Sequence, residues 1–377
     1  MCTSFPVLLC YNSPMFKKPL DMLAIGDITI DAFIHIPNTS SDSAHIGTGT
    51  HIVCTDAAKE HCELCLPFPD KIPFDSVQEI AGVGNSANAA VAAARLGLSS
   101  ALVASVGDDR HGRQCIETLK KNTVDTRYMS VEKGIETNYH YALWFDTDRT
   151  ILIKHHEFHY DFLKNKNTAK PDPNPPRWIY LSSLSDNSYD YHVDIATYLE
   201  KNLSVKLAFQ PGTFQMKLGT EKLAPFYRRS DVFIVNIEES QLILQTKDEN
   251  IETLLLGLAK LGPKIVLITD GPNGAYMYDN SNGAGRPYFM PIYPDIKPPY
   301  ERTGCGDAFS ATFVSALILG KTPLEALTWA PINSMSVVED VGAQAGLLSR
   351  AQLEDFLKNA PPSYQPTIYN NHLENQS

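Results

Sequence analysis

The segment Glu301–Ser310, with the sequence ERTGCGDAFS, joins two glycines and a carboxylate to the start of an apolar run. That run predicts a well-packed helix that ends at Gly320. Gly304 and Gly306 therefore lie at the mouth of a helix, where glycine lets successive backbone N–H groups turn toward one point. Together with the helix dipole, these amides predict a site for a phosphate or a developing anion.

Asp307 stands at the same helix mouth. Phosphoryl transfer asks a protein mainly for positioning and charge stabilisation, plus one group that accepts the proton of the attacking hydroxyl. Asp307 is therefore a candidate general base beside a transferring phosphoryl group. The alternative is that Asp307 only caps the start of the helix, as carboxylates commonly do.

A second glycine motif covers Gly82–Asn88 and leads into an alanine-rich run that ends at Gly97. Taken alone, this pattern predicts a glycine turn followed by a helix that packs closely on a sheet. No Gly-x-x-x-x-Gly-Lys-Ser/Thr sequence occurs, so the chain is not a P-loop enzyme.

These two motifs resemble the signatures of the ribokinase/PfkB family of carbohydrate kinases. Asn88–Gly97 is similar to the first signature and Thr303–Phe309 to the second, in the right order and at the right separation. Four shorter segments also resemble family motifs: Gly26–Asp31 the sugar-binding first strand, Gly107–Gly112 the turn after a strand, Asn236–Glu239 the Asn-x-x-Glu motif, and Thr269–Gly274 the nucleotide-binding turn. The resemblance runs from Leu23 to Leu357.

The resemblance implies a kinase that uses ATP and Mg²⁺ to phosphorylate a hydroxyl of a sugar or sugar derivative. It implies that Asp307 is the catalytic base and that the amides of Gly304, Cys305 and Gly306 form an anion hole. The residues implied to bind the acceptor are Asp31, Gly84 and Asn88, with Asp27 as a second-line candidate.

On the nucleotide side, the residues implied by the resemblance are Asn236, Glu239, Thr269, Gly271, Gly274 and Gly342. Glu239 would bind Mg²⁺ through water, because Mg²⁺ usually keeps several waters and uses few protein carboxylates. The alternative is that Glu239 merely occupies the first turn of a helix, where the dipole stabilises it.

Departures from the family pattern bear on specificity. Glu301 replaces the usual Asp before the anion hole, a position tied to the monovalent cation site, which argues against activation by potassium (K⁺). Thr29 replaces the Asn that is usual in ribokinase, which argues against ribose as the specific substrate. The acceptor is left open among sugars, phosphosugars and nucleosides, with Arg302 and Lys217 as candidates for a substrate phosphate.

Two other functions compete with the sugar kinase. Nucleoside kinases share these motifs and are the nearest enzymatic alternative. A non-catalytic ligand sensor on the same fold belongs to a different class, since fold alone does not determine function. The sensor predicts loss of the base or of the anion-hole glycines, whereas Asp307, Gly304 and Gly306 are all present.

Strand-like and helix-like runs alternate along most of the chain, which predicts an α/β fold with a parallel sheet covered on both faces. The strands are expected at 23–27, 101–106, 178–181, 206–209, 232–235 and 265–269, and the helices at 86–98, 112–121, 191–201, 221–227 and 251–261. The extended segments 28–36 and 136–155 are expected to form a small separate sheet. With the resemblance, this predicts a ribokinase-like three-layer sandwich with a mainly parallel central sheet and a small β lid.

The expected organisation is a poorly ordered leader at 1–20, a kinase domain at 21–360 and a disordered tail at 361–377. Residues 37–73 have the composition of an insertion. Within it, Cys54, Cys62 and Cys65 have C-x7-C-x2-C spacing with histidines nearby, a set that could bind structural zinc (Zn²⁺). The alternative is three free thiols in a variable loop.

Charge and composition exclude several classes of partner. The net charge is −11 over 377 residues, which argues against a broad nucleic-acid surface. No run of 18 apolar residues occurs, so we expect no membrane span. The seven cysteines do not form a secreted framework, and the cytoplasm is the expected compartment. The edges of the lid sheet could pair two copies in a homodimer.

Overall fold

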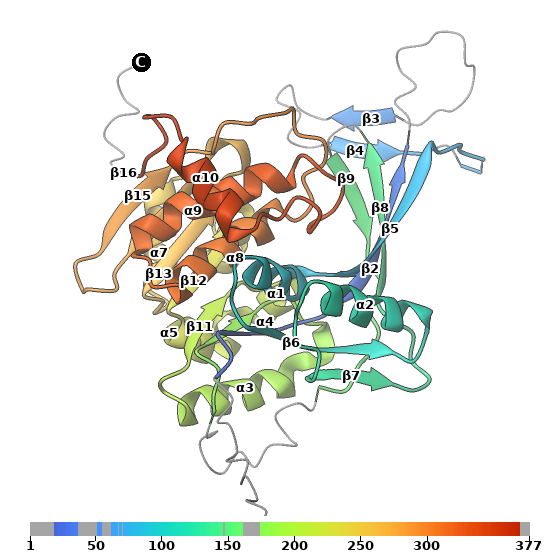
Figure 1. Ribbon diagram of the computed structural model, residues 1–377, viewed down its shortest axis with the longest axis horizontal. Helices are drawn as coiled ribbons and strands as arrows, with labels where there is room; N and C mark the ends of the chain where they lie inside the picture. The colour runs from blue at the N-terminus through green and yellow to red at the C-terminus, as the bar shows by residue number, and fades with distance from the viewer. Residues whose placement is uncertain are drawn as a thin grey trace, which may run out of the picture.

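The computed structural model describes residues 19–36, 51–54, 62–66, 68–69, 71–145, 148–160 and 174–369. These residues form a ten-stranded sheet, a four-stranded sheet and a two-stranded hairpin. Figure 1 shows the four-stranded sheet standing out from the main body, at the upper right of the view.

The large sheet has the strand order β16-β15-β14-β13-β12-β11-β10-β1-β6-β7. Its strands are β1 (Met22–Ile25), β6 (Ser100–Gly107), β7 (Met129–Glu132), β10 (Trp178–Leu181), β11 (Lys206–Phe209), β12 (Val232–Asn236), β13 (Ile265–Thr269), β14 (Ala275–Asp279), β15 (Arg286–Met290) and β16 (Thr367–Ile368). Neighbours from β7 to β13 are parallel, and those from β13 to β16 are antiparallel. The mainly parallel central sheet is therefore confirmed, and β10, β11 and β13 coincide with the predicted runs.

Helices cover both faces of this sheet. They are α1 (Asn85–Arg95), α2 (Arg110–Lys121), α3 (Tyr189–Lys201), α4 (Thr213–Lys222), α5 (Ala224–Arg229), α6 (Ile237–Leu244), α7 (Ile251–Ala259), α8 (Cys305–Ile318), α9 (Pro323–Val337) and α10 (Arg350–Lys358). Successive residues of β1 enter opposite cores, because side chains alternate across a strand. Met22 packs with α1, α8 and α9, whereas Leu23 packs with α3, α5 and α7. This is the predicted three-layer sandwich.

The small sheet is the expected lid, with the order β5-β2-β8-β9. Three of its strands, β2 (Thr29–His35), β8 (Tyr139–Phe145) and β9 (Asp148–Leu152), come from the two segments expected to form it. The fourth, β5 (Ser76–Val83), was not predicted, because its first four residues are all exposed and show no alternation. Pairing of two copies through this sheet stays a prediction.

The Cys-containing insertion forms a hairpin of β3 (His51–Cys54) and β4 (Cys62–Cys65), in which Cys54 is opposite Cys62. The side chains of Cys54 and Cys62 lie outside the described residues, as does most of segment 37–61. Cys65 is a half-buried free thiol. The zinc site therefore stays a prediction.

The tail expected to be disordered from Pro361 is ordered in its first nine residues. Tyr364 is buried, its hydroxyl donates to the carbonyl of Thr328 at 2.7 Å, and its ring meets that of Tyr293 edge-on. Strand β16 then pairs with β15. The buried side chain of Tyr364 anchors this segment, although the polar composition of the segment predicts disorder. Residues 1–18 and 370–377 lie outside the described residues.

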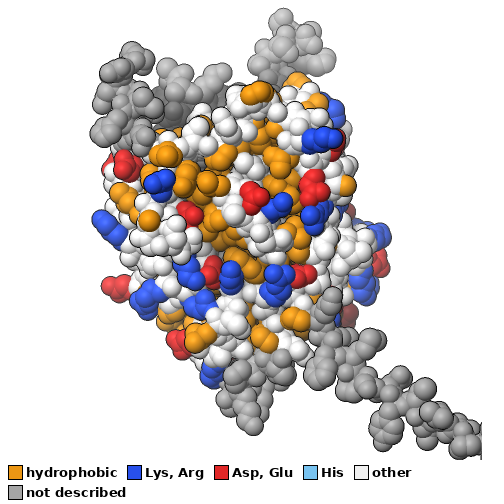
Figure 2. All heavy atoms as spheres, turned by 60° about the vertical axis from the view of Figure 1, so that its left-hand side comes forward, with side chains coloured by type: hydrophobic (Ala, Val, Ile, Leu, Met, Phe, Trp, Pro, Cys, Tyr) orange, Lys and Arg blue, Asp and Glu red, His pale blue; other side chains and the backbone are white. Residues whose placement is uncertain are grey.

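Charges of both signs are interspersed on the face shown in Figure 2, where apolar side chains form a strip between them. No extended basic patch is visible on this face, apart from what the grey atoms cover. Within the described ranges, no helix combines the length and apolar character needed to cross a bilayer.

Candidate active site

Helix α8 begins with backbone N–H groups that point out of the helix. Gly304 precedes it with φ +81°, and a Cβ at this residue would come within 2.1 Å of the Ala343 Cβ. A Cβ at Gly306 would meet nothing within 4 Å, because that position faces open space. Within the described part of the chain, no oxygen accepts a hydrogen bond from the N–H of Gly304, Cys305 or Gly306, although the Gly306 N–H interacts with the Cys305 thiol. The lack of oxygen partners fits the predicted anion hole, whose role stays a prediction.

The Asp307 carboxylate is held by three side-chain amides. Asn85 and Gln210 donate to Oδ1 at 3.0 and 3.2 Å, and Asn88 donates to Oδ2 at 2.8 Å. Asn85 and Asn88 lie three residues apart on α1 and share a face, while Gln210 directly follows β11. Two segments distant from α8 in sequence therefore fix the orientation of its carboxylate.

The proton affinity of Asp307 suits a general base. Burial raises the pKa of Asp307 above its ordinary value, the three amides lower it in part, and the charge of Asp31 raises it again. A carboxylate with a raised pKa and a fixed orientation can accept a proton from a neighbouring hydroxyl.

Asn88 has its own orienting partner. Gln344 donates to Asn88 Oδ1 at 3.0 Å and to the carbonyl of Gly82 at 2.8 Å. Because the Asn88 oxygen faces Gln344, its NH₂ group faces Asp307. Gln344 therefore orients the Asn88 side chain so that it donates a hydrogen bond to the Asp307 carboxylate.

Two of the residues predicted to bind the acceptor lie near Asp307: Asn88 donates to its carboxylate, and the charge of Asp31 raises its pKa. Asp31 lies opposite His140 on the parallel strands β2 and β8, with 3.2 Å between Oδ1 and Nδ1. The second-line candidate Asp27 lies in the same region, 3.3 Å from Nδ1 of His155. Gly84 lies against Asp27, since a Cβ there would come within 2.8 Å of the Asp27 carbonyl oxygen.

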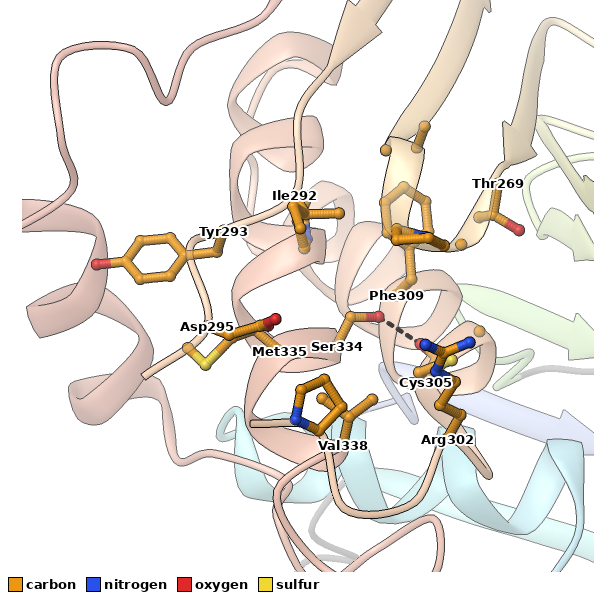
Figure 3. A pocket seen from close by; sticks show the side chains of 17 residues that line it. Thr269, Ile292, Tyr293, Asp295, Arg302, Cys305, Phe309, Ser334, Met335 and Val338 are labelled. Carbon is orange, nitrogen blue, oxygen red and sulfur yellow. Dashed lines mark hydrogen bonds between the residues drawn. The ribbon is translucent and has the colours of Figure 1, made fainter. Parts of the chain in front are cut away.

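A pocket of about 190 Å³ opens at the start of α8 (Figure 3). The predicted residues Thr269, Gly271, Gly274, Cys305 and Gly306 line it. Its remaining lining is Pro272, Ala275, Ile292, Tyr293, Asp295, Pro299, Arg302, Phe309, Pro331, Ser334, Met335 and Val338. Ser334 on α9 donates to the Cys305 carbonyl, which joins the two helices at the pocket floor. An apolar pocket that ends at free backbone amides can take a flat base at one end and phosphates at the other.

Asn236 and Glu239 form a reciprocal capping box at the start of α6. Asn236 Oδ1 accepts from the Glu239 N–H at 2.7 Å, and Glu239 Oε2 accepts from the Asn236 N–H at 2.9 Å. Both lie outside the lining of the pocket. Burial raises the pKa of Glu239, as do the charges of Asp307 and Glu238. This excess of negative charge fits a divalent cation, and the capping box does not use Oε1.

The fully buried carboxylate of Glu301 lies beside the anion hole. It accepts bonds from the N–H and hydroxyl of Thr303 at 2.7 and 2.6 Å, and from the N–H of Gly342 at 3.3 Å. Its cationic neighbour is Arg149 on lid strand β9, with 3.6 Å between Nε and Oε1. Burial raises the pKa of the Cys305 thiol, and the charge of Arg149 offsets part of that rise. Arg149 therefore brings positive charge from the lid to the anion hole.

Gly342 was expected to contact the nucleotide, but it lies outside the lining of the pocket. Its N–H binds Glu301, and a Cβ at this position would come within 2.3 Å of Ile80 in lid strand β5. A role for Gly342 against the nucleotide stays a prediction. Of the two phosphate-binding candidates, Arg302 lines the nucleotide-side pocket and Lys217 is exposed above the Phe214 ring.

Several residues of the site escaped the sequence analysis. Asn85 could have been found from its spacing to Asn88, because positions i and i+3 share a helix face. Gln210 follows a parallel strand at its carboxyl end, where ligands commonly bind. Arg149, His140 and His155 carry no local motif, and only the folded lid brings them to the site.

Comparison with known proteins adds independent findings. Residues 50–350 match the model of the pfkB family carbohydrate kinases. The chain is 23% identical over 338 residues to the probable chloroplastic fructokinase-6 of Arabidopsis thaliana, covering 82% of this chain and 84% of the relative. It is 27% identical over 284 residues to the ribokinase of Bacillus subtilis, covering 75% and 89%. The structure of Arabidopsis thaliana ribokinase complexed with ribose and ATP superposes with a TM-score of 0.67 at 19% identity, covering 90% and 99%.

The two glycines of the anion hole predict opposite effects of the same substitution. Gly304→Ala forces a side chain into Ala343 at a left-handed backbone position, so we expect it to lower the free energy of unfolding by about 2 kcal/mol or more. Gly306→Ala points into open space, so the fold should keep its stability while ATP binding weakens about tenfold. Thermal unfolding and calorimetric titration with ATP measure both effects. Unchanged ATP binding by Gly306→Ala would contradict the anion hole.

Proposed function

This chain belongs to the pfkB family of carbohydrate kinases, and on that basis we propose that it transfers the terminal phosphoryl group of ATP to a sugar hydroxyl with Asp307 as general base. The observation that carries the proposal is the arrangement at the start of α8. A carboxylate held by three amides lies beside three backbone N–H groups without oxygen partners among the described residues. Base and anion hole are adjacent, as in-line phosphoryl transfer requires.

The proposed step balances with these groups alone. The acceptor oxygen attacks the terminal phosphorus of ATP, and its proton passes to a carboxylate oxygen of Asp307. The bond between that phosphorus and its bridging oxygen breaks, and ADP leaves. The amides of Gly304, Cys305 and Gly306 stabilise the charge on the transferring group, because they are preorganised and need no reorientation.

Magnesium would be held through water by Glu239, with Asn236 orienting that carboxylate through the capping box. When bound, Mg²⁺ would neutralise phosphate charge and orient the phosphates for transfer. The nucleotide would occupy the pocket between Thr269 and Val338. Its apolar wall supports a purine base, and its inner end at Gly306 supports the phosphates.

A sugar fits the acceptor side better than a nucleoside does. The side chains that gather next to Asp307 are acids, amides and imidazoles, which match the hydroxyl groups of a sugar. A nucleoside base would need an apolar slot in the same place. A non-catalytic sensor has no use for three donors that hold one carboxylate in a fixed orientation.

Arg149 supports a reaction that does not need potassium. A buried carboxylate requires a counter-charge, and Arg149 provides one for Glu301 from within the chain. We therefore propose that the lid arginine supplies the charge for which other proteins would need a monovalent cation. The same pair ties the lid to the loop that precedes the anion hole.

Asp307→Asn should lower kcat for sugar phosphorylation about a thousandfold, because the amide cannot accept the proton. The KM for ATP should change little, since Asp307 is not needed to hold the nucleotide. The measurement is ATP consumption against a panel of sugars, phosphosugars and nucleosides, with the surface variant Asp355→Asn as control. Equal turnover by wild type and Asp307→Asn would refute the role of Asp307.

The wild-type rate of sugar phosphorylation should not change when Na⁺ replaces K⁺ at constant ionic strength.

Arg149→Ala should lower kcat/KM about tenfold, because it leaves the Glu301 carboxylate buried without a counter-charge. Added guanidinium should restore part of that loss, whereas it should not stimulate the wild type. Strong potassium stimulation of the wild type, or full activity of Arg149→Ala, would contradict this role.

A further inference from the structure

Four buried polar atoms in one region of the acceptor side have no hydrogen-bond partner among the described residues. They are Oδ2 of Asp27, Oδ1 of Asp31, Nε2 of His140 and Nδ1 of His155. The side chains are only 7 to 16% exposed, so bulk water does not readily satisfy these atoms. Buried polar atoms without partners cost free energy, and a cluster of them points to a ligand that completes their bonds.

The two histidines belong to two acid–imidazole pairs. His140 pairs with Asp31, and His155 pairs with Asp27, at nitrogen–oxygen distances of 3.2 and 3.3 Å. Neither pair is aligned as a hydrogen bond, so the unpartnered atoms of both pairs are left to another group. The imidazole rings lie 5.1 Å apart, so the two pairs are neighbours.

The fold holds each pair in place. Asp31 and His140 occupy the same register on β2 and β8, so their side chains leave the lid on one face. Asp27 is fixed by the Tyr160 hydroxyl, which donates to Oδ1 at 2.8 Å and leaves Oδ2 to another partner. The His155 ring packs edge-on against Phe214 of α4. The lid therefore supplies both members of the first pair, whereas the second pair joins the segment between β1 and β2 to the segment that follows β9.

The resemblance already implies that Asp31 binds an acceptor hydroxyl; we propose that the Asp27–His155 pair is a second hydroxyl-binding subsite, and that the two pairs together select an uncharged polyol over an acceptor that carries a carboxylate or a phosphate. This inference rests on the proposed kinase function and extends it to the class of substrate. One hydroxyl fits each pair, because its O–H can donate to the carboxylate while its oxygen accepts from the imidazole N–H. The acceptor needs two such hydroxyls besides the one that reacts.

The negative charge of this region disfavours binding of an anionic acceptor. Asp27, Asp31 and Asp307 bring three carboxylates to this side of the site, and the charge of Asp31 is felt at Asp307. A carboxylate or phosphate on the acceptor would be repelled by these groups. Lys217, which lies over the Phe214 ring, is exposed and solvated, so it offsets this repulsion weakly.

The test is calorimetric titration of the full chain in the presence of a non-hydrolysable ATP analogue. The uncharged probes are D-fructose, D-ribose and D-glucitol, and the anionic probes are D-gluconate and D-fructose 6-phosphate. At least one uncharged polyol should bind tenfold or more tightly than either anion. Binding of an anion as tight as that of the best polyol, or binding of none of the five, would overturn the inference.

Two variants of the Asp27–His155 pair distinguish loss of a hydroxyl-binding subsite from general damage to the fold. Asp27→Asn and His155→Gln should each weaken binding of the best polyol about tenfold. Asp27→Asn should at the same time bind D-gluconate more tightly than the wild type does, because one repelling charge is gone. His156→Gln, a neighbouring histidine outside both pairs, should bind like the wild type. Wild-type polyol affinity in both pair variants would refute the subsites.

Phosphorylation measured in parallel with ATP distinguishes failure of this inference from failure of the proposed function. Selective polyol binding without phosphate transfer to any probe would support the subsites and contradict the kinase proposal. Phosphate transfer with a preference for D-gluconate would support the kinase and contradict the subsites.

Discussion

The site depends on one constraint, the burial of the Asp307 carboxylate at the start of a helix. A carboxylate removed from water is costly unless hydrogen-bond donors replace the lost hydration. Asn85, Asn88 and Gln210 supply those donors, and the helix dipole of α8 adds favourable charge. The donors come from α1 and from the end of β11, and the carboxylate comes from α8, so the fold must bring three distant segments together. The layers of the fold can be understood as the means of meeting this requirement.

The lid carries charge to both halves of the site. On the nucleotide side, Arg149 of β9 faces the buried Glu301, and Trp144 of β8 packs edge-on against Tyr300. On the acceptor side, the β8 residue His140 reaches Asp31. Because one small sheet contacts both the loop before the proposed anion hole and the acids proposed to bind the acceptor, its position would link the two substrates. A lid that excludes water from this region would also protect ATP from hydrolysis.

Local patterns carried much of the prediction. Buried runs such as Trp178–Leu181 identified the parallel strands, and the two glycines before Asp307 identified the start of α8, where the base and the anion hole are proposed, since both features depend on neighbours in the chain. Contacts between segments that are distant in the chain could not be predicted from local sequence patterns. Nothing near Arg149 indicates that it meets a glutamate about 150 positions later, and β5 has no alternation because its first half is solvent-exposed on both faces. The ordered segment around Tyr364 was not predicted, because its composition is polar and the order depends on the burial of one aromatic side chain.

The acidic limb of the pH dependence of kcat/KM tests the central role of Asp307 most directly. The base must be deprotonated to act, so kcat/KM should rise as pH rises through the pKa of Asp307, which burial holds above its ordinary value. The Asn85 hydrogen bond lowers that pKa in part. Asn85→Ala removes the bond, and the account predicts that the acidic limb moves to higher pH. An acidic limb that stays in place in this variant would contradict the assignment of Asp307 as the base.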